Sequence, residues 1–160
     1  MDDVLTVVVE IPKGSRNKYE MDHETGQIFL DRMLFTATMY PADYGFIEGT
    51  LGGDGDPLDA LVLVGEPTFP GCHIRVRPVG LFRMTDEKGE DEKILCVPPR
   101  DPTWSHIEDL SQIPEPLQNE IEHFFQVYKE LEGHKVSTDG FEDRAAALNV
   151  IAAARVRAAG

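Results

Sequence analysis

Basic residues are scarce in this 160-residue chain, and the shortage excludes one large class of proteins. Only 15 side chains are Lys or Arg, against 29 Asp or Glu, which gives a formal net charge of −14. A protein that binds the phosphate backbone of a nucleic acid needs a basic face, so this charge argues against that class. The charge does not exclude a small anionic substrate, provided that metal ions mediate its binding.

Long apolar runs and cysteine frameworks are also missing. No run approaches the roughly 20 apolar residues that span a bilayer, and the start Met1-Asp2-Asp3 is acidic where a signal peptide would be basic. Cys72 and Cys96 have no metal-type spacing, so we predict two buried free thiols rather than a disulfide. Because repeats, linkers and low-complexity tracts are missing as well, the sequence predicts a single cytoplasmic domain over residues 1–160.

The apolar patterning places strands first and helices last, which predicts an α+β domain built on a mostly antiparallel sheet or barrel. The sequence leaves open whether the Arg-bearing tail beyond residue 135 covers the sheet or projects into solvent. Strands are predicted at residues 5–11, 18–22, 27–32, 60–64, 73–84 and 94–97, and helices at residues 116–132 and 145–158.

The acidic turn over residues 54–59 is the most unusual stretch of the chain. Asp54, Asp56 and Asp59 would repel one another if all three were ionised. A divalent cation relieves that repulsion, and oxygen ligands of this kind suit magnesium, calcium or manganese. The turn cannot be an EF-hand, because the twelfth loop position is Gly65 instead of glutamate. A solvated acidic turn is the alternative interpretation.

A second acidic stretch, residues 85–93, is predicted to be the loop of a hairpin between two strands. Cations also stand beside tyrosines or acids, namely Lys18, Arg32 and Lys129. Taken singly, each would be an ordinary surface charge. Together they indicate a magnesium–phosphate site, where metals neutralise phosphate oxygens and Lys and Arg balance the remaining charge. The aromatic residues 40–46 could form a wall of that site or ordinary core.

The acidic turn resembles a known signature. Asp54-Gly55-Asp56-Pro57-Leu58-Asp59-Ala60 is similar to the signature of the soluble family I inorganic pyrophosphatases, and the chain length matches their short prokaryotic form. Other segments between residues 5 and 132 resemble the family in the same order. They are Glu10-Ile11-Pro12, Lys18-Tyr19-Glu20, Asp31-Arg32, Tyr40-Pro41-Ala42-Asp43-Tyr44-Gly45, Arg77-Pro78-Val79-Gly80, Met84-Thr85-Asp86-Glu87, Gly89-Glu90-Asp91 and His123-Phe124-Phe125-Gln126-Val127-Tyr128-Lys129.

The resemblance implies a fold and an activity. The fold would be a five-stranded, OB-like closed β-barrel with two flanking α-helices. The activity would be Mg²⁺-dependent hydrolysis of inorganic pyrophosphate to two orthophosphates by a metal-activated water, without a covalent intermediate. Several Mg²⁺ ions would bind per site, with Mn²⁺ or Zn²⁺ able to substitute. The resemblance also implies a homo-oligomer, with a homohexamer favoured, and neither nucleic acid nor membrane as a partner.

The resemblance further implies a role for each matched position. Asp56 is the predicted general base that deprotonates the water, and Asp91 is the alternative. Asp59 would bridge two metals, and Tyr40 would support the site. The implied metal ligands are Glu10, Glu20, Asp54, Asp59, Asp86 and Asp91, and the implied substrate-binding residues are Lys18, Arg32, Tyr44, Lys93, Tyr128 and Lys129.

Two residues near the predicted site keep an open role. His23 could contact a metal or phosphate or could be a surface turn residue, and Lys88 could pair with neighbouring acids or face solvent. Two other functions compete with hydrolysis as explanations of the predicted site residues. A cation buffer would explain the acids but leaves Lys18, Arg32 and Lys129 without a use. An OB-type nucleic-acid module would explain a barrel, but the charge of −14 opposes it.

Overall fold

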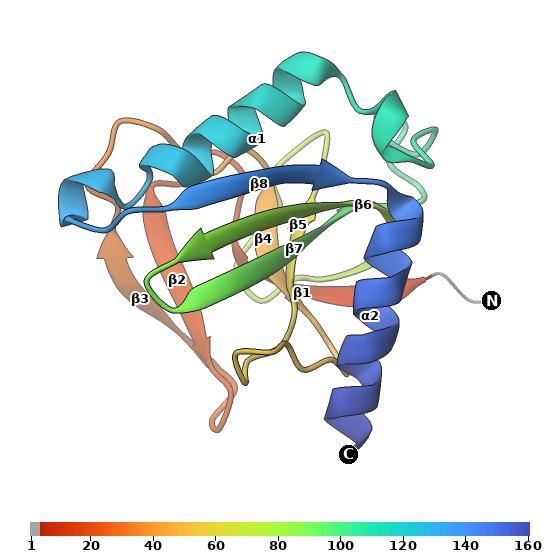
Figure 1. The fold of residues 1–160 in the computed structure, drawn as a ribbon, viewed down its shortest axis with the longest axis horizontal. Coiled ribbons are helices and arrows are strands. Elements are labelled where there is room, and N and C mark those ends of the chain that lie inside the picture. The colour runs from red at the N-terminus through yellow and green to blue at the C-terminus, as the bar shows by residue number, and fades with distance from the viewer. Residues whose placement is uncertain (1–3) are drawn as a thin grey trace.

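The computed structural model describes residues 4–160, so the acidic start Met1-Asp2-Asp3 lies outside the described residues. Strands come first and helices last, as predicted, except that one strand lies between the two helices (Figure 1). The elements are β1 (Leu5–Ile11), β2 (Asn17–Asp22), β3 (Gln27–Met33), β4 (Asp43–Ile47), β5 (Asp59–Val62), β6 (His73–Asp86), β7 (Gly89–Val97), α1 (Glu115–Val127), β8 (Ser137–Glu142) and α2 (Arg144–Ala159), with short 3₁₀ turns at Leu110–Gln112 and Glu130–Glu132.

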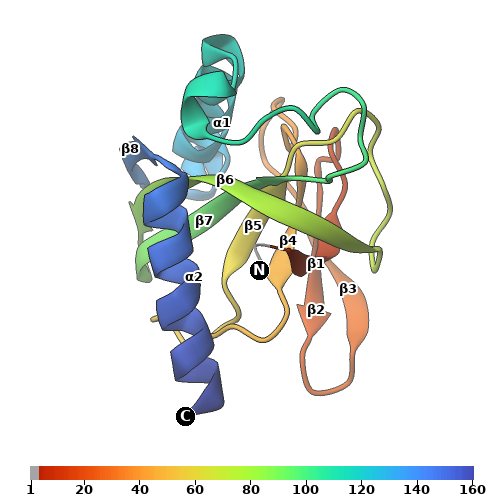
Figure 2. The ribbon, with the colours of Figure 1, turned by 90° about the vertical axis from the view of Figure 1, so that its right-hand side faces the viewer.

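The main sheet closes on itself. Its strand order is β1-β4-β5-β7-β6-β8, and β1 also pairs with β6, so five strands form a closed ring and β8 continues beyond it. β5 and β7 run parallel, whereas the other neighbours are antiparallel. β2 and β3 form a separate hairpin, and Figures 1 and 2 both place this hairpin and α2 on opposite sides of the ring. The predicted α+β architecture is therefore confirmed.

Alternate side chains of the central strands face two different apolar cores. Along β5, Leu61 packs in the core that contains α1, and Ala60 and Val62 pack in the core that contains α2. β7 repeats the pattern, with Leu95 on the α1 side and Ile94 on the α2 side. Side chains two apart along a strand point the same way. Residues just before these apolar runs therefore lie at the rim of one core or the other.

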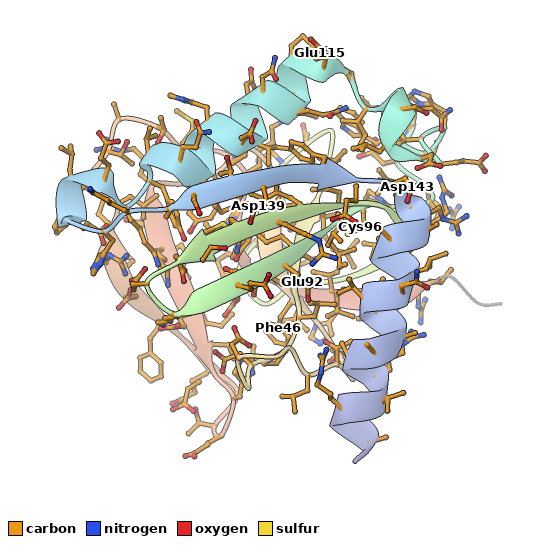
Figure 3. The ribbon with its side chains drawn as sticks, in the orientation of Figure 1. Phe46, Glu92, Cys96, Glu115, Asp139 and Asp143 are labelled. Carbon is orange, nitrogen blue, oxygen red and sulfur yellow. The ribbon has the colours of Figure 1, made fainter. Side chains whose placement is uncertain are left out.

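The C-terminal tail covers the sheet. Asp143 precedes helix α2 (Figure 3), and its side chain accepts a 3.1 Å hydrogen bond from the Ala146 N–H and so caps the first turn. Ala147, Ile151 and Ala154 recur at helical spacing and are buried against the ring. Of the two possibilities that the sequence left open, the structure shows the covering helix.

Two strands were missed by the sequence analysis, and their backbones explain why. β4 contains Gly45, where a Cβ atom would lie 1.9 Å from the Val8 carbonyl oxygen, so close packing of β4 on β1 requires glycine there. β8 is polar and includes Gly140 with φ of +79°, yet it pairs with the edge presented by β6. Neither segment has the β-branched composition that predicts strands.

Two predicted boundaries were wrong. The acidic loop of residues 85–93 is mostly strand, because β6 and β7 pair as far as Asp86 and Gly89 and leave only a two-residue turn. Helix α1 was predicted to continue to Glu132, but it ends at Val127. Lys129 leaves the helical conformation, with φ of −112° and ψ of 3°, and Gly133 ends the following 3₁₀ turn with φ of +86°.

The cysteines and the helices bear on two further expectations from the sequence. Cys72 and Cys96 are both free thiols, as predicted, but only Cys96 is buried; Cys72 is half-buried, so its predicted burial was wrong. Within residues 4–160, none of the helices has the length and apolar character needed to cross a membrane.

Candidate active site

A pocket opens at the rim of the α1-side core, where β1, β2, β5, the β6–β7 hairpin and the end of α1 meet. Its lining includes each of the predicted site residues except Arg32. The lining residues are Glu10, Ile11, Lys18, Tyr19, Glu20, Tyr40, Tyr44, Asp54, Asp56, Asp59, Asp86, Lys88, Glu90, Asp91, Lys93, Tyr128 and Lys129.

The base of the pocket is a compact cluster around one lysine. The parallel pairing of β5 with β7 sets Asp59 opposite Lys93, and Asp91 lies two residues earlier on the same face of β7. The Lys93 Nζ lies 3.1 Å from Asp59 Oδ2 and 2.9 Å from Asp91 Oδ2, and it donates a 2.6 Å hydrogen bond to the Tyr44 hydroxyl. Lys93 is only 1% exposed, so these contacts replace its hydration.

Burial and charge oppose one another in this cluster. Burial raises the pKa of the Asp59 carboxyl to about 6, even though Lys93 acts in the opposite direction. Burial is also the largest single influence on Asp91 and acts to raise its pKa, but the charge and hydrogen bond of Lys93, together with Asp59 and Lys129, lower the pKa of Asp91 overall. Burial alone would lower the pKa of Lys93, and the two aspartates raise it. The cluster therefore favours a charged lysine held by an ionised Asp91.

Glu10 faces the same pocket from a strand irregularity. The pairing of β1 with β4 shifts register between Val9 and Ile11, which makes Glu10 the extra residue of a β-bulge, a feature that often re-aims a side chain near an active site. Its Oε2 accepts a 2.9 Å hydrogen bond from the Met21 N–H of β2. Burial nevertheless raises the pKa of Glu10 to about 7, with a smaller contribution from the nearby charge of Asp59.

The acidic turn forms the exposed part of the wall. Asp54 Oδ1 accepts a 3.0 Å hydrogen bond from the Asp56 N–H, and the Gly52 N–H donates to the Asp56 carbonyl at 2.7 Å. Gly55 has φ of +92°, a conformation that favours glycine. Asp54 and Asp56 are exposed, whereas Asp59 is half-buried at the start of β5. The Asp54 side chain and the backbone thus fix the turn together, and both carboxylates remain exposed to ligands.

The opposite wall joins the β6–β7 turn to the segment after α1. Lys129 Nζ lies 3.5 Å from Asp86 Oδ2 and 3.6 Å from Glu87 Oε1, and also lies over the Tyr128 ring at 5.4 Å. The Lys88 N–H donates a 2.8 Å hydrogen bond to Asp86 Oδ1. Asp86 is therefore held from two sides, and Tyr128 and Lys129 face the pocket because α1 ends just before them.

Arg32 lies outside the pocket lining, beside Lys18. The two residues are opposite one another in the β2–β3 hairpin, and Asp31 occupies a register shift next to them. Arg32 Nη1 contacts Asp31 Oδ2, and Lys18 Nζ lies 3.7 Å from the same oxygen and 3.9 Å from Glu20 Oε1. Arg32 also binds Glu132, 100 residues further along the chain. Lys18 and Glu20 thus share one face, as predicted.

The aromatic segment proves to be both wall and core. Tyr40 and Tyr44 line the pocket, and their ring centroids lie 5.4 Å apart. The Tyr40 ring also packs 4.6 Å from Phe124 of α1, and Tyr40 is 1% exposed. Burial raises the pKa of both tyrosines well above the ordinary value, so their hydroxyls stay protonated and can donate hydrogen bonds.

Comparisons with known proteins agree with this geometry. The family model for inorganic pyrophosphatase matches residues 7–159. This chain is 60% identical over 148 residues to an inorganic pyrophosphatase from Leifsonia xyli, which covers 92% of this chain and 91% of that protein. It is 65% identical over 129 residues to one from Streptomyces coelicolor, covering 81% and 79% of the two chains. A crystal structure of inorganic pyrophosphatase from Thermus thermophilus superimposes with a TM-score of 0.96 at 48% identity, covering 99% and 92%.

This chain belongs to the inorganic pyrophosphatase family. The membership confirms the resemblance to the short prokaryotic form, and it makes the chain a hydrolase of the inorganic diphosphatase class. Almost the whole chain is superimposed on the pyrophosphatase structures from Thermus thermophilus and Helicobacter pylori, so the likeness of fold extends over the ring and both helices.

The pocket of this pyrophosphatase family member contains residues that the sequence analysis did not assign. Tyr19 and Glu90 line it. Both lie within family segments beside residues that were assigned to the site, and this position was the signal that could have identified them. Lys88, whose role was open, also lines it. His23 does not belong to the lining. It is an exposed turn residue whose ring lies nearly perpendicular to that of Phe46, with 4.8 Å between the ring centroids, which matches the surface alternative.

The donor set of the pocket suits a hard divalent cation. The lining has eight carboxylates against four lysines, and no thiol or imidazole. Such all-oxygen ligands are those that Mg²⁺ prefers, and thiols or imidazoles would favour softer metals. Across residues 4–160, no three acidic, histidine or cysteine side chains converge into a complete metal cage. Lys93 and Lys129 lie between the carboxylates and hold them by ion pairs.

Proposed function

We propose that the chain hydrolyses inorganic pyrophosphate to two orthophosphates with Mg²⁺ as its cofactor and without a covalent intermediate. The observation that carries the proposal is the buried Asp59–Lys93–Asp91 cluster at the base of a pocket lined by carboxylates and lysines. This arrangement pairs sites for cations with sites for a phosphate anion. A cation buffer would have no use for the four lysines.

The carboxylates are proposed to hold the metal ions. The donor set fits Mg²⁺, with Mn²⁺ or Zn²⁺ able to substitute, and Asp59 is central enough to serve two ions. Bound Mg²⁺ supplies Lewis-acid chemistry, which acidifies water and neutralises phosphate oxygens. The proposed metal-binding residues are Glu10, Glu20, Asp54, Asp59, Asp86 and Asp91.

The cationic and phenolic side chains are proposed to bind pyrophosphate and stabilise charge on the leaving phosphate. A water oxygen bonds to one phosphorus, the bridging P–O bond breaks, and the leaving phosphate carries away the electron pair. No Ser, Thr, Cys or His lines the pocket in the described part of the chain, so no side chain of those types is placed for covalent attack. The proposed substrate-binding residues are Lys18, Arg32, Tyr44, Lys93, Tyr128 and Lys129.

Asp56 is proposed as the general base that takes the proton of the attacking water. Its carboxylate is exposed at the pocket wall. Asp91, the alternative, already accepts a hydrogen bond from Lys93, and its pKa is lowered, so it is the weaker proton acceptor. The proton then leaves with the phosphate products.

Five further features belong to the proposal and rest on the family resemblance together with the composition and charge of the chain. The closed ring of five strands would be the OB-like barrel of the family, and residues 1–160 would form one pyrophosphatase domain. The protein would be a cytoplasmic homo-oligomer, with a hexamer favoured. Neither nucleic acid nor membrane would be a partner.

One assay tests the proposed function. Phosphate released from pyrophosphate is measured with Mg²⁺, and again after the metal is removed with EDTA. We expect rapid release with Mg²⁺, loss of release in EDTA, and recovery when Mg²⁺ is restored. Wild-type protein that releases no phosphate in the presence of Mg²⁺ would refute the proposal.

A further inference from the structure

One ion pair outside the pocket joins two elements that carry proposed substrate-binding residues. Arg32 Nε donates to Glu132 Oε1 at 3.0 Å and to Oε2 at 3.1 Å, and Arg32 Nη2 lies 2.7 Å from Oε1. A guanidinium that uses two nitrogens on one carboxylate is held in orientation as well as in position. The two residues come from the β2–β3 hairpin and from the 3₁₀ turn after α1.

Burial makes this pair different from an ordinary surface ion pair. The Glu132 side chain is 9% exposed and that of Arg32 is 28% exposed. The hydrogen bond from Arg32 to Glu132 is the main reason that the pKa of Arg32 is raised. If Arg32 were lost, the nearly buried carboxylate of Glu132 would keep its charge without the guanidinium that balances it.

The pair is one end of a chain of alternating charges that leads into the pocket. Arg32 contacts Asp31 through its Nη1, and Lys18 Nζ lies 3.7 Å from Asp31 Oδ2 and 3.9 Å from Glu20 Oε1. Lys18 and Glu20 line the pocket. At the other end, Glu132 follows the pocket residues Tyr128 and Lys129 by only a few positions.

We infer that Glu132 is a positioning residue that orients the Arg32 guanidinium at the edge of the pocket and fixes the β2–β3 hairpin against the Tyr128–Lys129 segment. Arg32 and Lys129 then approach the same diphosphate from fixed places. This inference rests on the proposed function, because it assigns Arg32 a substrate contact. Glu132 itself does not line the pocket. Misplacing a binding group by a small distance weakens its contacts with the bound substrate, and a loss of binding shared by the ground state and the transition state raises KM with little change in kcat.

The test compares Glu132→Gln with Glu130→Gln, a matched change at an exposed position of the same 3₁₀ turn. We expect Glu132→Gln to raise the KM for magnesium pyrophosphate about tenfold with kcat changed less than threefold, and Glu130→Gln to match wild type. Glu132→Asp, which keeps the charge on a shorter side chain, should recover part of the loss. Arg32→Lys should not recover the fork geometry and should resemble Glu132→Gln.

A double variant separates positioning from a purely structural role. If Glu132 acts through Arg32, the variant Arg32→Ala/Glu132→Gln will have the same KM as Arg32→Ala alone. If the two substitutions instead raise KM by independent factors that multiply in the double variant, the inference is overturned. A Glu132→Gln protein that melts at a lower temperature while its KM and kcat stay at wild-type values would also overturn it. Should Glu132→Gln fail to fold, Glu132→Asp against Glu130→Gln gives the same comparison.

A binding measurement keeps this inference separate from the proposed function. Calorimetry with Mg²⁺ and methylenediphosphonate, a diphosphate analogue without a hydrolysable bridge, should show about tenfold weaker binding to Glu132→Gln than to Glu130→Gln. If the wild-type protein does not hydrolyse pyrophosphate, the proposed function is refuted but the positioning role is not. Equal binding of the diphosphonate by both variants, with hydrolysis intact, would refute the positioning role alone.

Discussion

The base and the rim of the pocket hold their carboxylates in opposite ways. At the base, Asp59 and Asp91 are fixed by neighbouring strands and share the buried ammonium of Lys93. At the rim, Asp54 and Asp56 stand exposed on a turn that is held by hydrogen bonds within the turn itself. A substitution at the base should therefore change both the activity and the stability of the protein, whereas a substitution at the rim should change the activity without disturbing the fold. The predictions below test this difference, from the largest expected effect to the smallest.

Lys93→Met should damage both fold and activity. It leaves two carboxylates at the base without their cation, and removing one partner of a buried ion pair costs about 3–5 kcal/mol. We expect that loss in urea denaturation with EDTA, together with loss of most phosphate release. Mg²⁺ should restore part of the stability, because a metal ion can replace the missing charge. Unchanged stability in EDTA would show that the base does not depend on Lys93.

Asp56→Asn should separate activity from stability. Removing a general base lowers kcat by about 10²–10⁴-fold, while an exposed isosteric change shifts the unfolding free energy by no more than about 0.5 kcal/mol. Steady-state kinetics and calorimetric Mg²⁺ binding would check this, with the exposed Glu66→Gln as control. Nearly normal turnover by Asp56→Asn would transfer the role of base to Asp91 or another group.

Glu10 should give the metal-free protein an inverted pH dependence. The pKa of Glu10 is raised from 4.5 to about 7, so the folded state binds more protons than the unfolded state between these values. Stability contributed by this group is therefore present at low pH and is lost as pH rises through about 7, by up to about 3 kcal/mol. In EDTA, the stability of wild type relative to Glu10→Gln should fall between pH 5 and pH 8. A difference that is constant with pH would contradict the prediction.

Lys129→Ala should have the smallest effect of the four. Its ammonium holds Asp86 and Glu87 at 3.5–3.6 Å and faces the pocket, so its loss should raise the KM for magnesium pyrophosphate about tenfold with little change in kcat. Lys135→Ala, an exposed change a few residues further on, is the control and should behave as wild type. If KM and kcat of Lys129→Ala both equal those of wild type, Lys129 does not bind substrate.

Local patterns predicted much of the fold. β1, the β2–β3 hairpin and helix α2 follow from composition and periodicity, because each is consistent with its own local sequence. β4 and β8 were missed because their strand conformation depends on partners elsewhere in the chain. Helix α1 was also predicted too long. Lys129 lies beyond the end of the helix and forms ion pairs with the distant β6–β7 turn, and the local sequence does not show such long-range contacts.

The candidate site was predictable as a set of residues but not as an arrangement. The acidic turn and the family segments identified nearly all of the lining residues. They could not show that Lys93 lies between Asp59 and Asp91, because that contact depends on the parallel pairing of β5 and β7. Nor could they show that Arg32 is held by Glu132, a residue 100 positions away. Spacing identifies functional residues, whereas long-range pairing decides what each one touches.

The closed ring also has a consequence for how fast this chain folds. Ring closure pairs β1 with β6 and places Leu5 opposite Val76, so contacts between distant parts of the chain must form before the sheet is complete. Each such contact costs loop-closure entropy before any apolar burial compensates for it. Chains dominated by distant pairings fold in milliseconds to seconds, whereas helical bundles of similar stability fold far faster. The closed ring at whose rim the pocket opens is therefore also a slow-folding topology.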